Sequence, residues 1–556
     1  MSEPESVSYF TPTLYEAAGW GAADDRPNVT VVGGGPVGLV TALGLAHRGT
    51  RVTVLERKNR VGLGSKAAAL TSRSLEVLAG VGVDRPFLEQ GLPWDSGRSF
   101  YRGREISRFR IPRPEGRAHP SLVNLPQPFM EQYLVDACLA HPLVDIRWRS
   151  EFAGLTQDAD GCTLDVDTPS GRRTLTTDWV VAADGARSAV RASLGQPLEG
   201  DTYTNSFVIC DLRMTSSRDT ARLCWFDPPA FPGRTVLLHQ LAPELWRIDY
   251  QVSEHEDLDA AIDPAVVAPK VAEHFAYIGE DADWEIEWLS LYRAHARSLD
   301  SYRHGRVLFA GDAAHILPVF GVRGLNSGIA DSVNLAWKLA LVARGTAPDT
   351  LLDTYDWEQR DFYRQNRAYA DHSTLYMTPD STGTRLVRDA SLSLALVDPA
   401  LEFLADPSYS TPLDWDDGPL VEPDAAPWPA GASGPSAGGL VENLPVEAGG
   451  PHLNDVLGPW FTLLCVDADA PEPASDLLKA VRVPSEGPLG AHLGAVPGSA
   501  YLLRPDRHVL ARWTSPDACD WPDRLVRMGL VRPGLVGTGH AEPGLAGTGL
   551  AGPGLA

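Results

Sequence analysis

The segment 306–328 combines residue types that could hold a ligand rich in hydroxyl groups and negative charge. A buried apolar strand ends there in Gly311-Asp312, a loop with Pro318 and several glycines follows, and Gly324-Leu-Asn326 opens a helical pattern. A carboxylate fixed at a strand end can accept hydrogen bonds from ligand hydroxyls. A helix that begins after glycines offers free N–H groups and a partial positive charge to an anion. With a glycine turn near Gly33, this pattern indicates a flavin nucleotide held at both ends.

The glycine turn 33–38 has the spacing Gly-x-Gly-x-x-Gly. It lies between a β-rich run at 28–32 and a helical pattern at 39–48, and a second strand is predicted at 51–56. The backbone of such a turn approaches a pyrophosphate, and the following helix points its N-terminus at the charge. Glu56 ends the second strand, where it suits a ribose hydroxyl. Strand, turn, helix and acid together predict a dinucleotide site.

Other polar residues of the sequence are weaker signals for a ligand or metal site. Asp184-Gly-Ala-Arg-Ser188 follows an apolar strand at 179–183 and fits either a ligand contact or a surface turn. His315 lacks carboxylate neighbours in the sequence, so a metal role is not expected. The six cysteines have no paired spacing, which predicts neither a disulfide framework nor a zinc site.

Size and charge limit the classes of function. A chain of 556 residues predicts two or three domains. The formal charge of −24 argues against a nucleic-acid partner, because phosphate binding needs surplus Lys and Arg. Apolar runs stay below the roughly 20 residues of a membrane-spanning helix. Residues 1–27 lack the apolar core of a signal peptide, so we expect a cytoplasmic protein without a membrane contact.

Changes of pattern along the chain predict an α/β protein of several segments. Short alternating strands occupy 145–183, and strand signals dominate 206–291, as expected for a second sheet inserted into the nucleotide-binding domain. The predicted segments are an N-terminal, loosely ordered extension 1–27, the first half of an FAD-binding domain at 28–195, a substrate-binding β-sheet domain at 196–294, the second half of the FAD-binding domain with helices at 295–405, a Pro- and Gly-rich linker 406–450, a small α/β module 451–530, and a disordered tail 531–556 with Pro-Gly-Leu repeats.

The glycine turn, Asp184-Gly185 and Gly311-Asp312, in this order, resemble the FAD-dependent aromatic hydroxylases of the para-hydroxybenzoate hydroxylase type. The resemblance covers about 28–375 and implies a Rossmann-like FAD-binding domain with an inserted β-sheet substrate domain. Leu502-Leu-Arg-Pro-Asp506 and Ala511-Arg-Trp513 are similar to the thioredoxin-like module of the phenol hydroxylase and 3-(3-hydroxyphenyl)propionate hydroxylase branch. Without a CxxC motif, this module would be structural or would take part in contacts of a homodimer.

The resemblance also implies which residues hold FAD. The expected contacts are Gly33, Gly35 and Gly38 at the pyrophosphate, Glu56 at the adenosine ribose, Lys66 near the pyrophosphate and the flavin, Gln127 near the ribityl chain, Asp184 near FAD and the nicotinamide donor, Asp312 at the ribityl chain, and Gly324, Leu325 and Asn326 at the N1–C2=O edge of the isoalloxazine. Pro36, Val37, Arg57 and Gly311 are also expected to bind FAD. Lys66 stands where the family usually has Arg, which keeps the charge but loses a bidentate fork.

Two residues are expected at the reaction site. Pro318 would lie over it. Arg323 departs from the family pattern, because many relatives have Gln between the glycines at this position. Arg323 could stabilise the anionic reduced flavin or an acidic substrate, and the alternative is a surface salt bridge.

The mechanism that the resemblance implies uses NADH or NADPH to reduce FAD, without a second Rossmann domain. Reduced flavin and O2 would form a C4a-hydroperoxide that transfers one oxygen atom to an electron-rich small molecule, of phenolic or aromatic polyketide-like type. On the strands of the inserted sheet, four side chains could face this substrate or could serve in packing: Arg222, Trp225, His239 and Tyr250.

Other interpretations stay open. The same intermediate could hydroxylate the nitrogen of an amine or amino acid, or the protein could be a flavin-binding oxidase or scaffold without oxygenase activity. The basic stretch 98–117 could receive phosphates or an anionic substrate, or it could be a solvated hairpin.

Overall fold

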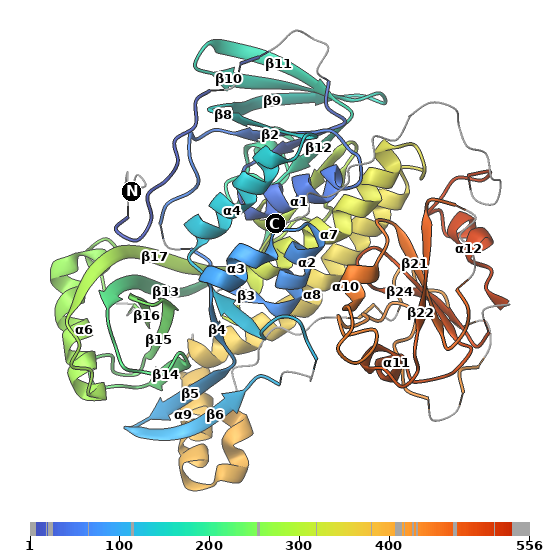
Figure 1. Ribbon diagram of the computed structural model, residues 1–556. Helices are drawn as coiled ribbons and strands as arrows, with labels where there is room; N and C mark the ends of the chain where they lie inside the picture. The colour runs from blue at the N-terminus through green and yellow to red at the C-terminus, as the bar shows by residue number, and fades with distance from the viewer. Residues whose placement is uncertain are drawn as a thin grey trace, which may run out of the picture.

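The computed structural model describes residues 7–535, apart from 18, 21–25, 65, 113–115, 253–255, 319, 380, 406–413, 416, 425–426, 430–431, 471–474 and 516–517. Arg113 of the basic stretch and the predicted tail beyond 535 therefore lie outside the described residues. Figure 1 shows the first domain in the centre, a second sheet on its left and a C-terminal module on its right.

The first domain is built on a mostly parallel sheet with the order β18-β19-β12-β1-β2-β8. Its strands are β1 (Val29–Val32), β2 (Val52–Glu56), β8 (Val144–Trp148), β12 (Trp179–Ala182), β18 (Arg303–His304) and β19 (Val307–Phe309). The four residues of β1 and of β12 are all buried, which explains why these strands are continuous apolar runs without alternation. Helices α1 (Pro36–Ala46), α4 (Gln127–Ala140) and α7 (Arg323–Ala343) accompany this sheet.

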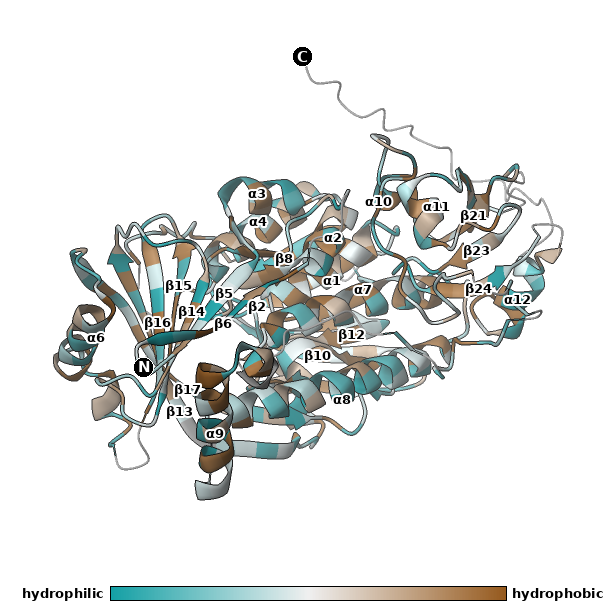
Figure 2. Ribbon diagram, turned by 90° about the horizontal axis from the view of Figure 1, so that it is seen from below, coloured by the Kyte–Doolittle hydropathy of each residue, from teal (hydrophilic) through white to brown (hydrophobic). Residues whose placement is uncertain are grey.

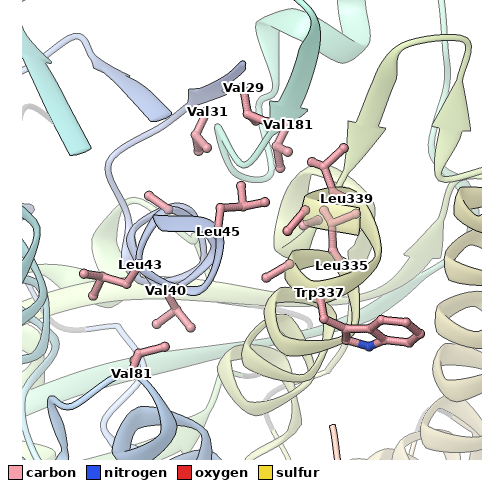
Figure 3. Packing of buried hydrophobic residues seen from close by; sticks show 14 of the residues in the cluster. Val29, Val31, Val40, Leu43, Leu45, Val81, Val181, Leu335, Trp337 and Leu339 are labelled. Carbon is pink, nitrogen blue, oxygen red and sulfur yellow. The ribbon is translucent and has the colours of Figure 1, made fainter. Parts of the chain in front are cut away.

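Helices α1 and α7 pack closely beside the strands. Figure 3 shows Leu45 of α1 and Leu339 of α7 beside Val31 and Val181 of the sheet. A methyl group added at Gly44 would lie 2.8 Å from the Cβ of Ala336, so this glycine permits the close approach of the two helices. The predicted βαβ unit is confirmed, with α1 beginning three residues earlier than expected, at Pro36.

Smaller elements surround this sheet. The strands predicted between 145 and 183 are confirmed as β8 to β12, of which three form a separate antiparallel sheet. These elements are α2 (Ser72–Gly80), α3 (Asp84–Gln90), the strands β3 (Ala69–Thr71), β4 (Leu92–Trp94) and β7 (Leu122–Asn124), the strands β9 (Glu151–Gln157), β10 (Cys162–Thr168) and β11 (Gly171–Thr177), and α5 (Ala189–Ser193).

The second sheet has the order β20-β17-β13-β16-β15-β14-β5-β6. Its strands are β5 (Ser96–Tyr101), β6 (Arg104–Arg110), β13 (Glu199–Met214), β14 (Arg222–Phe226), β15 (Thr235–Ala242), β16 (Leu245–Gln251), β17 (Trp284–Ser298) and β20 (His315–Ile316). The boundary predicted for the substrate domain, 196–294, is therefore too narrow, because β5 and β6 come from 96–110 and β14 pairs with β5.

One face of the second sheet is an apolar core. Alternate residues of its strands, such as Trp246, Ile248 and Tyr250 of β16, join a buried cluster together with residues of α6 (Pro264–Ile278). Figure 2 shows α6 along the outer side of these strands. Because side chains alternate along a strand, the residues between them point to the opposite face of the sheet.

The helices predicted between 329 and about 400 are α7, α8 (Leu351–Met377) and α9 (Thr382–Val397). Short 3-10 segments lie at η1 (Ala260–Ile262), η2 (Gly311–Ala313) and η3 (Pro399–Ala405). Within the described ranges, no helix is both long and apolar enough to cross a bilayer.

The C-terminal module contains a four-stranded sheet of order β22-β21-β23-β24, in which only β21 and β22 run parallel. Its elements are α10 (Leu453–Val456), β21 (Phe461–Val466), β22 (Leu478–Val483), α11 (Pro488–His492), β23 (Ala500–Leu503), β24 (Val509–Trp513) and α12 (Trp521–Arg527). This arrangement agrees with the predicted thioredoxin-like module, which stays a prediction.

Two predicted boundaries need correction. The described residues of the extension 1–27 pack against the first domain, since Val7 and Phe10 are buried and Tyr15 stacks on Trp148 with ring centroids 4.3 Å apart. Some stretches of the predicted linker 406–450 also pack, and Trp415 lies 4.2 Å from the ring of His508. In both segments isolated aromatic and apolar side chains are buried although they show no periodic pattern.

A buried ionic network joins the C-terminal module to α7 and α8. Arg504 donates to both carboxylate oxygens of Glu358, at 2.6 and 2.9 Å, and also to Asp506. Lys338 Nζ donates to Glu358 at 2.6 Å, and the indole N–H of Trp337 donates to Asp506 at 3.0 Å. This pairing raises the pKa of Arg504 despite its burial, and Arg504 together with Lys338 lowers the pKa of the buried Glu358 to about 2.

Candidate active site

Three distant segments meet at the carboxyl ends of β1, β12 and β19. A methyl group added at Gly33 would lie 2.4 Å from the carbonyl oxygen of Ala183, and one at Gly311 would lie 3.0 Å from the side chain of Val37. Gly328 of α7 also lies close to Val37. The glycine turn, the Asp184 turn and the Asp312 turn therefore form one edge, as ligand sites of open α/β sheets require.

The glycines of this edge divide into two kinds. Gly33 and Gly38 are required by the fold, because a methyl group at Gly38 would lie 2.1 Å from the carbonyl oxygen of Gly33 and Gly33 itself has φ +110°. Gly35 and Gly324, in contrast, have no atom within 4 Å of the position of an added methyl group. Free space beside these two glycines is what a bound nucleotide needs at both ends.

Glu56 and its neighbours shape the turn. The carboxylate of Glu56 accepts hydrogen bonds from the backbone N–H of Gly34 at 2.8 Å and of Lys58 at 2.9 Å. The remaining lone pairs of Glu56 can accept a ribose hydroxyl. Arg57 is exposed beside it, and Pro36 occupies the first turn of α1.

Asp184 and Asp312 have the character of ligand-binding carboxylates. The Oδ1 atom of Asp184 is buried without a hydrogen-bond partner, and burial raises the pKa of Asp184. Burial also raises the pKa of Asp312, opposed by His315 and Lys66, although its side chain is exposed to solvent. A carboxylate that is exposed to solvent can accept hydrogen bonds from ligand hydroxyls, such as those of a ribityl chain.

Asp331, which no sequence signal indicated, holds the Asp312 turn. It is fully buried on α7 and accepts hydrogen bonds from the backbone N–H of Gly311 at 2.8 Å and from His315 Nε2 at 2.7 Å. This carboxylate raises the pKa of His315 despite burial of the ring, so His315 is a structural partner. No group of three or more metal-ligating side chains occurs among the described residues.

Lys66 and Gln127 both lie close to the buried carboxylate of Glu131. Gln127 donates to Glu131 at 2.7 Å, and Glu131 also accepts the backbone N–H of Gly62 at 2.6 Å. Lys66 counteracts the effect of burial on the pKa of both Glu131 and Asp312, which places its charge near the two carboxylates. Glu131, which was not predicted as a site residue, orients the predicted ribityl contact Gln127.

The start of α7 is fixed by Asn326 and left open by Gly324. The side-chain amide of Asn326 accepts from Thr71 N–H at 3.0 Å and donates to the carbonyl oxygens of Ala69 and Val322. Its side chain is therefore a positioning group, and the partly exposed residues Gly324 and Leu325 are left to meet a ligand. The helix begins at Arg323, three residues before the predicted start at Asn326.

Arg323 is buried without an ion-pair partner among the described residues. It is 1% exposed, and its Nε and Nη2 atoms have no hydrogen-bond partner, while Nη1 donates to Asn366 at 3.2 Å. Burial lowers the pKa of Arg323 to about 10, so the guanidinium stays charged at neutral pH. The predicted alternative, a surface salt bridge, is wrong. Pro318 is buried in the loop that leads to this position.

The second sheet separates the four predicted substrate residues. His239 alternates with residues of the apolar core and lies beside Arg247, whose Nη1 donates to the carbonyl oxygen of Lys66 at 2.9 Å. This face of the sheet, with Arg222 and His239, is therefore turned toward the first domain. Trp225 and Tyr250 lie in the opposite, apolar core, where Tyr250 contacts Phe231 and Trp225 stacks on Phe100. Of the two interpretations, substrate contact and packing, packing is therefore the one found for Trp225 and Tyr250.

The basic stretch 98–117 contains a surface hairpin with local ion pairs. Arg98 and Arg108 both pair with Glu105, and Arg117 pairs with Glu442 of the C-terminal module. Of the two predicted interpretations, the solvated hairpin of β5 and β6 is the one found.

Comparison with known proteins decides the family. A family model described as FAD binding domain matches residues 26–369. The chain belongs to the FAD-dependent aromatic hydroxylases of the para-hydroxybenzoate hydroxylase type. It is 29% identical over 449 residues to a 3-(3-hydroxy-phenyl)propionate/3-hydroxycinnamic acid hydroxylase of Mycolicibacterium smegmatis, covering 79% of this chain and 76% of the relative. A relative with the same description from Shigella sonnei is 31% identical over 343 residues, 61% of this chain and 60% of that one.

Solved structures agree with this family. The flavin-dependent monooxygenase PieE in complex with FAD and substrate superposes with a TM-score of 0.74 at 26% identity, over 91% of this chain and 99% of that one. The OxyS anhydrotetracycline hydroxylase from Streptomyces rimosus gives a TM-score of 0.67 at 26% identity, over 90% and 98% of the two chains. The resemblance predicted from the sequence is confirmed, and the hydroxylase is an FAD enzyme.

Proposed function

We propose that this hydroxylase inserts one oxygen atom from O2 into an electron-rich phenolic or aromatic polyketide-like small molecule, with NADH or NADPH as electron donor. The supporting observation is that Arg247 of the second sheet donates to the carbonyl oxygen of Lys66, a residue whose charge acts on the pKa of Asp312. Bound FAD would supply the redox chemistry and the activation of O2. The chain's own residues would bind the cofactor, orient the substrate and exclude water.

The relatives support the choice of substrate class. PieE is described in complex with FAD and substrate, and OxyS as a hydroxylase of anhydrotetracycline. The test is substrate-dependent oxidation of NADH or NADPH by the holoenzyme, with phenols, polyketide aromatics and amino acids as candidates. We expect a product heavier by one oxygen atom from an aromatic. Oxygenation of an amine nitrogen, or peroxide formation alone, would contradict the proposal.

Gly35 and Gly38 provide a paired test of the pyrophosphate site. Gly35→Ala should leave the thermal midpoint of the FAD-free protein unchanged, because the added methyl group enters free space, but it should weaken FAD binding at least about tenfold by filling that space. Gly38→Ala should reduce both the thermal midpoint and the FAD binding, since its methyl group would collide with the carbonyl oxygen of Gly33. Flavin absorbance and circular dichroism measure the two effects, and normal FAD binding by Gly35→Ala would contradict the assignment.

Arg323 is proposed to stabilise negative charge at the start of α7. A buried cation without a counterion costs folding free energy and favours any nearby anion. Arg323→Gln should therefore raise the thermal midpoint of the FAD-free protein and lower the flavin reduction potential, by about 30 mV for a tenfold effect on a two-electron couple. Dye-coupled reduction measures the potential. An unchanged potential would assign Arg323 to packing alone.

A homodimer also stays a proposal. Helix α9 exposes four large apolar side chains, and Figure 2 shows this helix strongly apolar. They are Leu386, Val387, Leu394 and Val397. Exposed apolar surface of this kind is typical of protein contacts. Light scattering of the holoenzyme gives the mass, and a monomer would contradict the proposal.

A further inference from the structure

The face of the second sheet that is turned toward the first domain carries polar groups without protein partners. Asp249 on β16 is 8% exposed, and its Oδ1 atom has no hydrogen-bond partner. The Nδ1 atom of His239 on β15 is buried and equally unpartnered. Arg222 on β14 is partly buried and forms no ion pair with any described residue. Buried polar groups normally have partners, so the two buried, unpartnered atoms of Asp249 and His239 beside an arginine without an ion pair need an explanation.

Strand register brings the three side chains together. Leu223 pairs with Leu238, so Arg222 continues this ladder beside His239. On the other side of β15, Leu237 pairs with Asp249, two residues along the strand from His239. Side chains at such diagonal positions on one face are within reach of each other. The charge of Arg222 acts on both His239 and Asp249, which confirms that the groups are close.

The remaining charged neighbours are already engaged. Arg247 donates to Asp211 at 2.8 Å and to the carbonyl oxygen of Lys66. Burial, opposed by Arg247 and Arg222 and assisted by Asp211, raises the pKa of Asp249 to about 6. Burial and the two arginines lower the pKa of His239 well below its usual value, so its ring is neutral. Above pH 6 the cluster thus offers an anionic acceptor, a neutral imidazole and a cationic donor.

We propose that Arg222, His239 and Asp249 form the polar end of the substrate site, in which Asp249 accepts a hydrogen bond from a ring hydroxyl and Arg222 donates to a neighbouring carbonyl or carboxylate oxygen. This assignment rests on the proposed function and specifies its ligand class. The substrate is an aromatic compound with a hydroxyl group beside an oxygen acceptor. Such a ligand satisfies the three groups that the protein leaves unpaired, whereas an ether in place of the hydroxyl would not.

Paired probes test the hydroxyl contact. The holoenzyme is titrated with salicylate and 2-methoxybenzoate, and with 1-hydroxyanthraquinone and 1-methoxyanthraquinone, while the flavin spectrum is followed. We expect the wild type to bind at least one phenol about tenfold or more tightly than its ether. In Asp249→Leu this ratio should fall to about one. Arg222→Met should weaken both members of a pair, and Asp165→Leu, at an exposed position of β10, should change neither.

Stability separates recognition from a structural role. Asp249 is buried and charged, and its Oδ1 atom has no hydrogen-bond partner. Asp249→Leu should therefore raise the thermal midpoint of the holoenzyme by about 2 °C. A lower midpoint with an unchanged phenol-to-ether ratio would overturn the proposal. The absence of any phenol preference in the wild type would overturn it as well. All three variants are expected to keep their bound FAD, because none of the three positions is assigned to the cofactor. A wild type that does not bind FAD would contradict the proposed function and not this assignment.

Discussion

Replacement of Asp312 by alanine is expected to give a folded hydroxylase that has lost most of its FAD. The side chain of Asp312 is exposed to solvent, and the protein around its carboxyl group raises its pKa by partial desolvation. A hydrogen bond to a charged group contributes about 1.5–3 kcal/mol, so loss of this acceptor should weaken FAD binding by about tenfold to a hundredfold. Titration of FAD-free protein with the cofactor, followed by flavin fluorescence, measures the change.

A matched control is available on the same protein. Asp165 is an exposed residue of β10, in a different sheet from the strand that precedes Asp312, so Asp165→Ala removes a carboxylate of the same kind outside the cofactor edge. This variant should bind FAD like the wild type. Equal occupancy of the Asp312→Ala and Asp165→Ala proteins would show that Asp312 does not hold the cofactor.

Replacement of Arg504 by methionine should destabilise the whole enzyme. Arg504 is 1% exposed and compensates Glu358 and Asp506, which are equally buried. Without the guanidinium, Glu358 would keep its ion pair with Lys338, and Asp506 would keep its contacts with Trp337 and His508. Breaking a buried ion pair in this way costs about 3–5 kcal/mol. Urea denaturation at pH 7, followed by tryptophan fluorescence, should show the loss.

The comparison for this variant is Arg482→Met. Arg482 is an exposed residue of β22 in the same module, so it loses a charge without exposing a buried partner. We expect its denaturation midpoint to stay within experimental error of the wild type. If Arg504→Met behaved like Arg482→Met, the network would be unimportant for the attachment of the module.

Much of the cofactor edge could be predicted because its signals are local. The glycine turn follows a strand directly, and Asp312 follows β19 in the same way, so strand, turn and helix can be read from a few consecutive residues. Asp331 was missed because it acts over 20 residues of chain, through the backbone of Gly311. A single Asp within a helical pattern gives no sign of such a contact.

The candidate substrate residues on the second sheet were predicted only in part, because they were chosen by residue type and not by their position along the strands. Trp225 and Tyr250 were selected by residue type, but the alternation Trp246-Arg-Ile-Asp-Tyr250 already places Tyr250 with the apolar residues and Asp249 with Arg247. Period two would therefore have indicated Asp249. The pairing of β14 with β5 could not be predicted, since no local pattern specifies which distant strands meet.

The contribution of β5 and β6 to the second sheet has a practical meaning for enzyme engineering. Residues 96–110 supply one border of the second sheet, while its next strand along the chain begins about a hundred positions later. A chimera that transplants only 196–294 from a relative would leave the recipient's β5 against a foreign β14. A chimera that keeps the second sheet intact therefore requires that 96–110 and 196–294 be transferred together from the same relative.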